Sequence, residues 1–200
     1  TTNQNSDGGW GYNPGEGSNV YITSLTLKAL SLYNSVFINQ DSINRASAFL
    51  LAHQNTDGGF GSSPSKVYET ALALDALFAS GANNITTVVS NGVGYLTVNQ
   101  LSDGSWNEDP YSTALALRAL ASARANLAIS SDDISLSKPM PQADESVAIA
   151  ATIHNTGFDT ASNIIVRFYL GDPAAGGTQI GVDQVIPALV VGGAAQASIT

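Results

Sequence analysis

The chain reads Gln54-Asn55-Thr56-Asp57-Gly58-Gly59-Phe60 in its N-terminal half, and this stretch decides the fold because it occurs three times. The first copy begins at Gln4, 50 residues earlier, and the third begins at Gln100, 46 residues later. A second phrase follows each copy, a tyrosine that opens an apolar run. Two phrases that recur in the same order at this period indicate an array of one supersecondary unit. The tyrosines are Tyr21, Tyr68 and Tyr111.

Each unit is predicted to form a turn, a helix, a connection and a second helix. The Asp-Gly pairs favour turns, because glycine tolerates positive φ and the Asp carboxylate can accept bonds from the following amides. The runs Thr70–Leu77 and Thr113–Leu120 are rich in Ala and Leu and have almost no polar face, which predicts helices buried on most sides. The second helices are expected at about Asp41–Gln54, with Asp41 or Ser42 as N-cap, and at Thr86–Gln100.

The loops between the aromatic residue and the tyrosine shorten along the chain. Trp10 and Tyr21 are 11 residues apart, the second pair 8 and the third 5. Insertions in repeat arrays usually lie on one face, so these loops are expected to line a common rim.

The repeated turn positions are interpreted as structural. The aromatic residues could form a platform for a ligand, but a residue that recurs once per unit usually fills the interface between units. The glutamines are predicted to be buried and to bond backbone groups of their own or an adjacent turn. These positions are Gln4, Asp7, Trp10, Gln54, Asp57, Phe60, Gln100, Asp103 and Trp106.

The motif Gln-x-x-Asp-Gly-Gly/Ser-Trp/Phe, followed by Tyr-x-Thr-Ala-Leu, resembles the repeat of squalene-hopene cyclases and protein prenyltransferase β-subunits over roughly residues 1–126. The resemblance implies a partial α/α toroid of about five helices. It also implies that the Gln-to-Trp motif clamps adjacent repeats together. Because the chain begins inside a turn motif, we expect it to be part of a longer protein.

The Ala/Leu-rich helical pattern ends near residue 127, and the domain boundary is expected at about 127–131. Short segments of β character then alternate with turn signals, which predicts a β-sandwich. The predicted strands are Ser146–Ile153, Asn163–Leu170, Thr178–Val185 and Ala194–Thr200. Residues 131–200, with the turn Asn155-Thr156-Gly157, resemble the bacterial adhesion-related domain CARDB. That resemblance implies an immunoglobulin-like sandwich, here expected to be truncated.

Composition narrows the function classes. The net charge is −9 with only seven Lys and Arg, which argues against a nucleic-acid surface. There is no run of about 18 apolar residues, so no membrane span is expected. The chain has no cysteine, which excludes thiol catalysis, disulfides and Cys-ligated zinc. Few charges together with many small polar residues fit a secreted or cell-surface prokaryotic protein.

The residues expected for isoprenoid chemistry are missing from the sequence. Hopene cyclases use an Asp-x-Asp-Asp acid, prenyltransferases a zinc set that includes Cys, and toroidal thioester proteins a Cys near a Gln, none of which occurs here. Catalysis within this chain would need a lone acid, and the two candidates are Asp75 and Glu69. His53, near a helix end, is interpreted as structural. His154 is expected to be exposed, and Asp132-Asp133 to be a solvated strand entry.

A metal site is not expected, because each Asp-Gly turn offers one carboxylate and a tight calcium loop needs several. The least unfavourable candidates are Asp103, Glu108 and Asp109, which lie close together in the sequence.

Three charges stand at one repeat position. Lys28, Asp75 and Arg118 each follow the repeat tyrosine by seven residues. If the tyrosine-led helices lie side by side in register, these charges form a plus-minus-plus ladder. The alternative is three exposed charges that never meet.

The sequence favours a non-catalytic secreted or surface module that binds a ligand or another protein, with no catalytic residue and no cofactor in this chain. One alternative is a terpene cyclase or prenyltransferase-like enzyme whose catalytic residues lie outside it. Another is a stalk element without any ligand.

Overall fold

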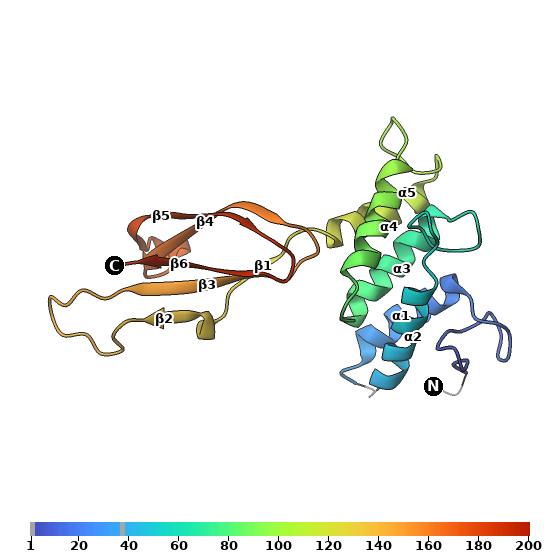
Figure 1. The fold of residues 1–200 in the computed structure, drawn as a ribbon, viewed down its shortest axis with the longest axis horizontal. Coiled ribbons are helices and arrows are strands. Elements are labelled where there is room, and N and C mark those ends of the chain that lie inside the picture. The colour runs from blue at the N-terminus through green and yellow to red at the C-terminus, as the bar shows by residue number, and fades with distance from the viewer. Residues whose placement is uncertain (1–2, 37–38) are drawn as a thin grey trace. The chain divides into compact units, whose positions relative to one another are not determined.

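A computed structural model describes residues 3–36 and 39–200. The chain divides into two compact units, the helical unit of residues 1–123 and the β-rich unit of residues 124–200 (Figure 1). The division falls just before the predicted boundary, because residues 124–126 bond to the β-rich unit. The amide of Phe158 donates to Arg124 O at 3.0 Å, and that of Thr156 donates to Asn126 O at 2.8 Å.

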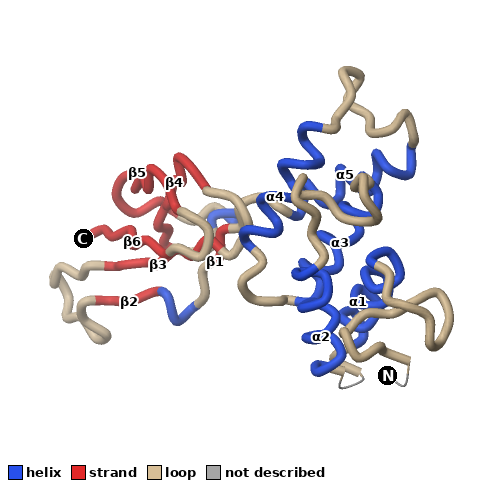
Figure 2. The backbone as a smooth tube through the Cα atoms, turned by 45° about the vertical axis from the view of Figure 1, so that its right-hand side comes forward, coloured by secondary structure: helices blue, strands red, loops and turns tan. Residues whose placement is uncertain are grey.

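The helical unit has five helices in the described part of the chain. The tyrosine-led helices α1, α3 and α5 form the front row, side by side with α3 in the centre (Figures 1 and 2). The back row consists of α2, which packs against α1 and α3, and α4, which packs against α3 and α5. Helix–turn–helix repeats therefore give a front row and a back row. The bounds are α1 Val20–Tyr33, α2 Gln40–Ala52, α3 Val67–Ser80, α4 Thr86–Val98 and α5 Pro110–Ser122.

Burial differs among the three front helices. In α3 an unbroken run from Glu69 to Leu77 is buried, as its Ala/Leu sequence predicts for a helix covered on both sides. The outer members of the row are less covered, since Leu25 of α1 and Leu117 of α5 are exposed. The prediction of burial on most sides therefore holds for α3 and is wrong for α1 and α5.

The back helices differ in detail from expectation. Helix α2 begins at Gln40, with Asn39 at the N-cap position and no side-chain capping bond, so Asp41 lies in the first turn and Ser42 is helical. In α4, a Cβ added to Gly92 would lie 2.9 Å from Leu74 Cδ2. Gly92 thus permits the close approach of α4 to α3.

The Asp-Gly turns are built alike. Asp57 Oδ1 accepts from the amide of Gly59 at 2.9 Å and from Ser65 Oγ at 2.7 Å, while Gly58 adopts φ +85°. Gln54 Nε2 donates to Gly58 O and to Val88 O, both at 2.8 Å, so it joins its own turn to α4. The bond to Ser65, followed by the backbone bond, lowers the pKa of Asp57.

The predicted bond from each glutamine to its own turn is present. Gln4 donates to Gly8 O at 2.8 Å and Gln100 to Gly104 O at 2.9 Å. The predicted burial is wrong, because Gln4 and Gln54 are half-buried and Gln100 is exposed. No helix follows α5 within the helical unit, so the third turn lacks the cover that the others receive.

A threonine hydroxyl links the two recurring phrases. The amide of Phe60 donates to Thr70 Oγ1 at 2.9 Å, and Trp10 and Trp106 donate in the same way to Thr23 and Thr113 at 2.9 and 3.0 Å. All three aromatic rings are buried, which places them in the core. The phrases recur together because each turn is fastened to the helix that follows it.

The β-rich unit contains two sheets in its described residues. In the first, β3 (Ile149–Asn155) pairs antiparallel with β1 (Leu127–Ala128), β2 (Ile134–Leu136) and β6 (Ala194–Ile199). In the second, β4 (Ala161–Leu170) pairs antiparallel with β5 (Thr178–Leu189). Apolar side chains from both sheets share one core. Its buried members are Ala151, Ile153, Ala161, Ile164, Ile186, Leu189 and Ala197.

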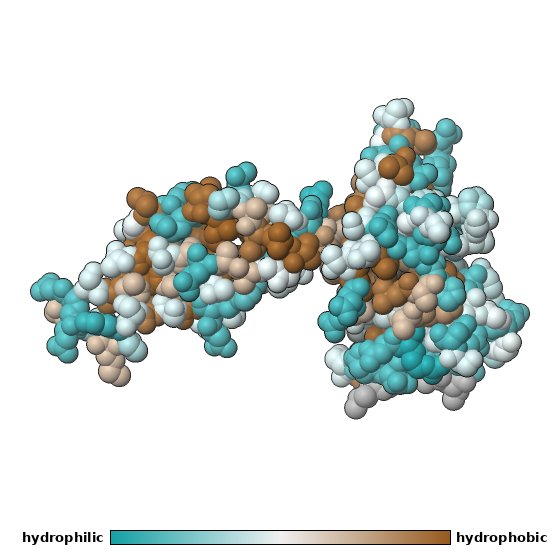
Figure 3. Space-filling model, viewed as in Figure 1, coloured by the Kyte–Doolittle hydropathy of each residue, from teal (hydrophilic) through white to brown (hydrophobic). Residues whose placement is uncertain are grey.

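Two strands extend beyond their predicted ends. Strand β3 begins later than predicted but continues through His154 to Asn155, and β5 runs through Pro187 to Leu189. Pro187 is tolerated because Ile186 and Ala188 on either side carry the pairing to β4. Apolar side chains reach the surface of both units (Figure 3).

The Asn155-Thr156-Gly157 turn is a buried polar junction. Asn155 is 1% exposed, and its amide nitrogen donates to Asp159 O and Leu189 O at 2.7 and 2.9 Å. Its oxygen accepts from the amides of Asn126 and Gly157. All four hydrogen-bonding positions of the side-chain amide are therefore filled.

Among the residues described, no helix is long and apolar enough to cross a membrane.

Candidate functional site

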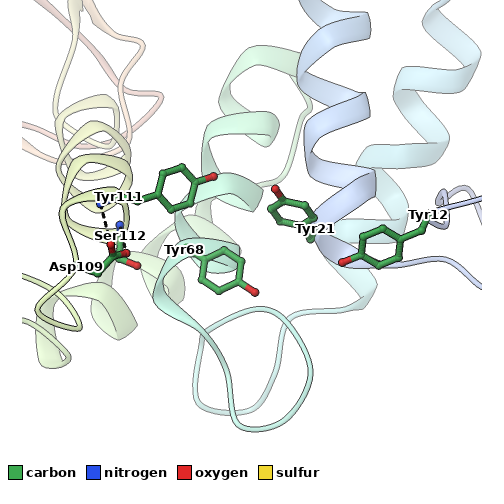
Figure 4. A pocket seen from close by; sticks show the side chains of 6 residues that line it. All are labelled: Tyr12, Tyr21, Tyr68, Asp109, Tyr111 and Ser112. Carbon is green, nitrogen blue, oxygen red and sulfur yellow. Dashed lines mark hydrogen bonds between the residues drawn. The ribbon is translucent and has the colours of Figure 1, made fainter.

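One hollow of the helical unit is lined by four tyrosines and has a volume of about 440 Å³. Tyr21, Tyr68 and Tyr111 each occupy the second position of α1, α3 or α5. Because these helices lie side by side, the equivalent positions bring the three rings together at the N-terminal ends of the helices. Tyr12, from the long first loop, adds the fourth ring, and Asp109 and Ser112 complete the lining (Figure 4).

Capping groups hold two of these helix ends in place. Asn19 Oδ1 accepts from the amide of Ile22 at 3.1 Å at the start of α1. Asp109 accepts from the amides of Tyr111 and Ser112 at 3.2 and 2.8 Å at the start of α5. Hydrogen bonding to Ser112, first through its side chain, lowers the pKa of Asp109, so this carboxyl is ionised at neutral pH.

Two of the tyrosine rings, those of Tyr21 and Tyr68, pack edge to face. The ring centroids of Tyr21 and Tyr68 are 6.0 Å apart with an interplanar angle of 75°. Burial, followed by the hydrogen bond to Glu69, raises the pKa of Tyr68 to about 12. Burial also raises the pKa of Tyr111. Tyr68 and Tyr111 therefore present uncharged aromatic rings to the hollow at physiological pH.

A carboxylate lies directly behind this wall. Glu69 is 7% exposed, and its Oε1 accepts from the Tyr68 hydroxyl at 2.9 Å. Its Oε2 would lie 2.7 Å from a Cβ added to Gly61, so the glycine leaves room for the carboxylate. Of the two lone acids suggested by the sequence, Glu69 is the one joined to the hollow.

The other acid, Asp75, forms the centre of an ionic ladder. Its Oδ2 bonds Lys28 Nζ and lies 2.5 Å from Arg118 Nη2, so the first of the two sequence alternatives is confirmed. The ladder lies seven residues, about 10.5 Å of helix, beyond the tyrosines. With a cation on either side, the Asp75 carboxylate is fully compensated.

The candidate metal residues surround a second hollow without converging. Asp103, Glu108 and Asp109 line a space of about 480 Å³. The Asp103 carboxylate accepts hydrogen bonds from the amide and hydroxyl of Ser105, at 2.9 and 2.7 Å, and Asp109 caps α5. Within residues 3–36 and 39–200, no three His, Asp or Glu side chains form a group that could hold a metal ion.

The histidines lie in separate units. His53 caps the end of α2, where its ring stacks on Phe49 at 3.9 Å and Nδ1 contacts Phe49 O at 2.7 Å. The His154 side chain is 42% exposed, in line with the prediction, and its Nε2 also pairs with Asp133 Oδ1 at 2.7 Å. Asp132 and Asp133 directly precede β2, as predicted for a strand entry, and Asp132 is exposed. Asp133 is half-buried and accepts from the amide and hydroxyl of Ser130, so this residue is anchored rather than freely solvated.

The tyrosine hollow was not predicted from the sequence. The signal was available, because the alignment that places Lys28, Asp75 and Arg118 in one row also places the tyrosines in a row. The contributions of Tyr12 and Glu69 carried no repeat signal, since each occurs in a single unit.

Comparison with known proteins identifies the helical repeats. A family model described as the squalene-hopene cyclase C-terminal domain matches residues 1–118. The chain belongs to this family. Drimenyl diphosphate synthase of Streptantibioticus cattleyicolor is 35% identical over 117 residues, covering 54% of this chain and 21% of that protein. Squalene–hopene cyclase of Zymomonas mobilis is 34% identical over 121 residues, covering 52% of this chain and 17% of that protein.

The chain therefore spans about a fifth of the length of these two relatives. A solution structure of GmR58A from Geobacter metallireducens shares 39% identity over 34% of this chain and 54% of that one, with a TM-score of 0.30. At that score the structural likeness carries no argument.

Proposed function

We propose that the helical unit is one part of the wall of a terpenoid-cyclase active site, with the initiating acid supplied by residues outside this chain. The observation that carries the proposal is the row of tyrosines at the ends of three neighbouring helices. The family relationship supports the same conclusion. This proposal replaces the hypothesis of a non-catalytic module that the sequence favoured, because both relatives are enzymes by name.

The chemistry of an isoprenoid cyclisation suits such a wall. The substrate chain is apolar and the intermediates are carbocations, which need positive charge stabilised without a nucleophile that would trap them. Aromatic faces attract cations through the ring quadrupole, more strongly where water is excluded. Neutral phenol rings give this attraction, and their position at the ends of packed helices fixes them before substrate arrives.

We further propose that α1, α3 and α5 are inner helices of an α/α toroid, with α2 and α4 as outer helices. The two-row arrangement of the five helices supports this. For the β-rich unit we propose an immunoglobulin-like sandwich of the CARDB type in a secreted or cell-surface protein. The shared apolar core of its two sheets supports the sandwich.

The protein expressed from its complete gene tests the catalytic proposal. It is incubated with farnesyl diphosphate and with squalene, and the products are identified by gas chromatography and mass spectrometry. We expect cyclic products from one of the two substrates. Replacing the central ring in Tyr68→Ala should lower turnover about 10-fold or more, equivalent to the loss of roughly 1.4 kcal/mol of cation stabilisation.

The matched control is Tyr33→Ala, because Tyr33 is an exposed tyrosine of the same unit that does not line the hollow. Isoprenoid binding without any turnover of the complete protein would refute the enzyme and restore the ligand-binding module. Equal losses in both tyrosine variants would show that the hollow is not the site.

A further inference from the structure

Glu69 of the helical unit has a buried carboxyl group without a cationic partner among the side chains that the structure describes. It is 7% exposed, yet in the described part of the chain no ion pair joins it to Lys, Arg or His. Burying a carboxylate without a cation is costly, and one tyrosine hydroxyl offsets only part of that cost. A buried acid beside a hollow lined by aromatic rings is a candidate functional residue.

The repeat itself does not require this charge. The position after the repeat tyrosine holds Ile22 in α1 and Ser112 in α5, so the same architecture forms with an apolar or a small polar residue. Gly61, at φ +108°, leaves the space that the carboxylate occupies. Glu69 is thus a feature of the middle unit alone, and it is joined to the hollow through its hydrogen bond to Tyr68.

The other carboxylates near the hollow are occupied. Asp109 accepts from two backbone amides at the start of α5. Asp75 bonds two cations. Glu69 therefore differs from both, because it bonds the hydroxyl of Tyr68, at 2.9 Å, and Tyr68 itself lines the hollow.

We infer that Tyr68 and Glu69 form the proton-accepting pair that ends the cyclisation, an inference that rests on the proposed function. A C–H bond next to the cationic carbon breaks, and its electron pair forms the C=C bond of the product. The proton passes to Tyr68 Oη while the hydroxyl proton of Tyr68 passes to Glu69 Oε1. The carbocation and the carboxylate become an alkene and a carboxylic acid, so atoms and charge balance.

Tyr68 is the catalytic member of the pair, because it lines the hollow and would contact the substrate. Glu69 acts through it, as the positioning residue that holds the hydroxyl and receives its proton. After the product leaves, the proton returns through the same hydroxyl to water that enters the hollow. No residue of the pair is consumed.

Glu69→Gln tests the pair in the complete protein. The amide has the shape of the carboxylate and can still accept from the Tyr68 hydroxyl, but it cannot take up a proton. We expect turnover to fall about 100-fold, the usual contribution of a general base. We also expect the surviving products to shift from alkenes to alcohols, because the cation lasts long enough for water to trap it.

Tyr68→Phe should shift the products in the same direction, and Glu69→Asp should restore part of the alkene share. The control is Glu145→Gln, which removes an exposed carboxylate from the β-rich unit and should change neither quantity. A merely structural role for Glu69 would lower the turnover without changing the ratio of alkene to alcohol.

A spectroscopic titration provides a second readout that needs no turnover. Ionisation of Tyr68 is isolated as the difference between the wild type and Tyr68→Phe in tyrosinate absorbance. It should occur near pH 12 in the wild type and at lower pH in Glu69→Gln, where the neighbouring charge is gone. An unchanged titration would show that the two groups are not coupled and would overturn the pair.

The two proposals fail differently. An active wild type whose Glu69→Gln variant makes the same product mixture overturns the proton-accepting pair and leaves the cyclase intact. A wild type that converts no isoprenoid refutes the cyclase and the proton step together.

Discussion

Replacement of Asp75 by Asn should destabilise the helical unit by about 2 kcal/mol. The Asp75 side chain is only 11% exposed, whereas those of Lys28 and Arg118 are 28% and 48% exposed. Breaking a fully buried ion pair costs about 3–5 kcal/mol, and breaking an exposed one costs about 0–1 kcal/mol. The value expected here lies between these limits, because both cations can turn toward solvent once the carboxylate is gone.

Tryptophan fluorescence during urea unfolding measures this loss in one unit. Both tryptophans of the chain, Trp10 and Trp106, are buried in the helical unit, so the signal does not include the β-rich unit. Asp41→Asn is the matched control, because Asp41 is exposed in the first turn of α2, and it should change stability by less than about 0.5 kcal/mol.

A double variant tests the cause. If repulsion between two uncompensated cations accounts for the loss, adding Lys28→Met to Asp75→Asn should restore part of the stability. An Asp75→Asn protein within about 0.5 kcal/mol of the wild type would refute the reasoning, since it would mean that the ladder has no net energetic effect.

Three further predictions follow from the contacts described. Thr70→Val should cost the helical unit about 1–3 kcal/mol, because it leaves the buried amide of Phe60 without an acceptor. The control Thr97→Val alters an exposed hydroxyl of α4, and an equal loss in both variants in urea unfolding would contradict the assignment. Hydrogen bonds from Ser130, and then from His154, lower the pKa of Asp133 from 3.8 to about 2. Since this pKa is depressed by folding, its stabilisation is complete above about pH 4 and is lost as the pH falls toward 2. The melting temperature of Asp133→Asn, followed by circular dichroism, should therefore fall less steeply over this range, and parallel curves for the two proteins would exclude the effect. Finally, calcium at low millimolar concentration should leave the melting temperature unchanged, whereas an increase that magnesium does not produce would reveal a metal site at the Asp-Gly turns.

The sequence predicted most where local chemistry repeats. The turns, the front helices and the charge ladder depend on residues that occupy equivalent positions, so one alignment places all of them. The exposure of Gln100 could not be predicted in this way. Burial at that position depends on whether another helix follows α5, and among the described residues of the helical unit none does. The same holds for Leu25 and Leu117, which belong to the outer members of the row.

The candidate site was harder to predict than the fold. Three of its tyrosines follow the repeat, but Tyr12 comes from a loop whose path the sequence does not define. The sequence identified Glu69 only as a lone acid. Its link to the hollow depends on the space that Gly61 leaves for the carboxylate and on the hydrogen bond from the Tyr68 hydroxyl. In the β-rich unit, the two-residue and three-residue strands β1 and β2 are too short for an alternating pattern to show.

The bonds that fasten each turn to its helix also close the loop between them. Besides the threonine bond, the backbone oxygen of Trp10 accepts from the amide of Asn19, that of Phe60 from Lys66 and that of Trp106 from Asp109, at 2.9 to 3.1 Å. Both ends of every loop are thus fixed, although the loops differ in length, and doubling such a loop costs only about 0.6 kcal/mol. Segments could be lengthened or exchanged at these three places while the helices stay in register. The first loop already shows the result, since its extra residues deliver Tyr12 to the hollow.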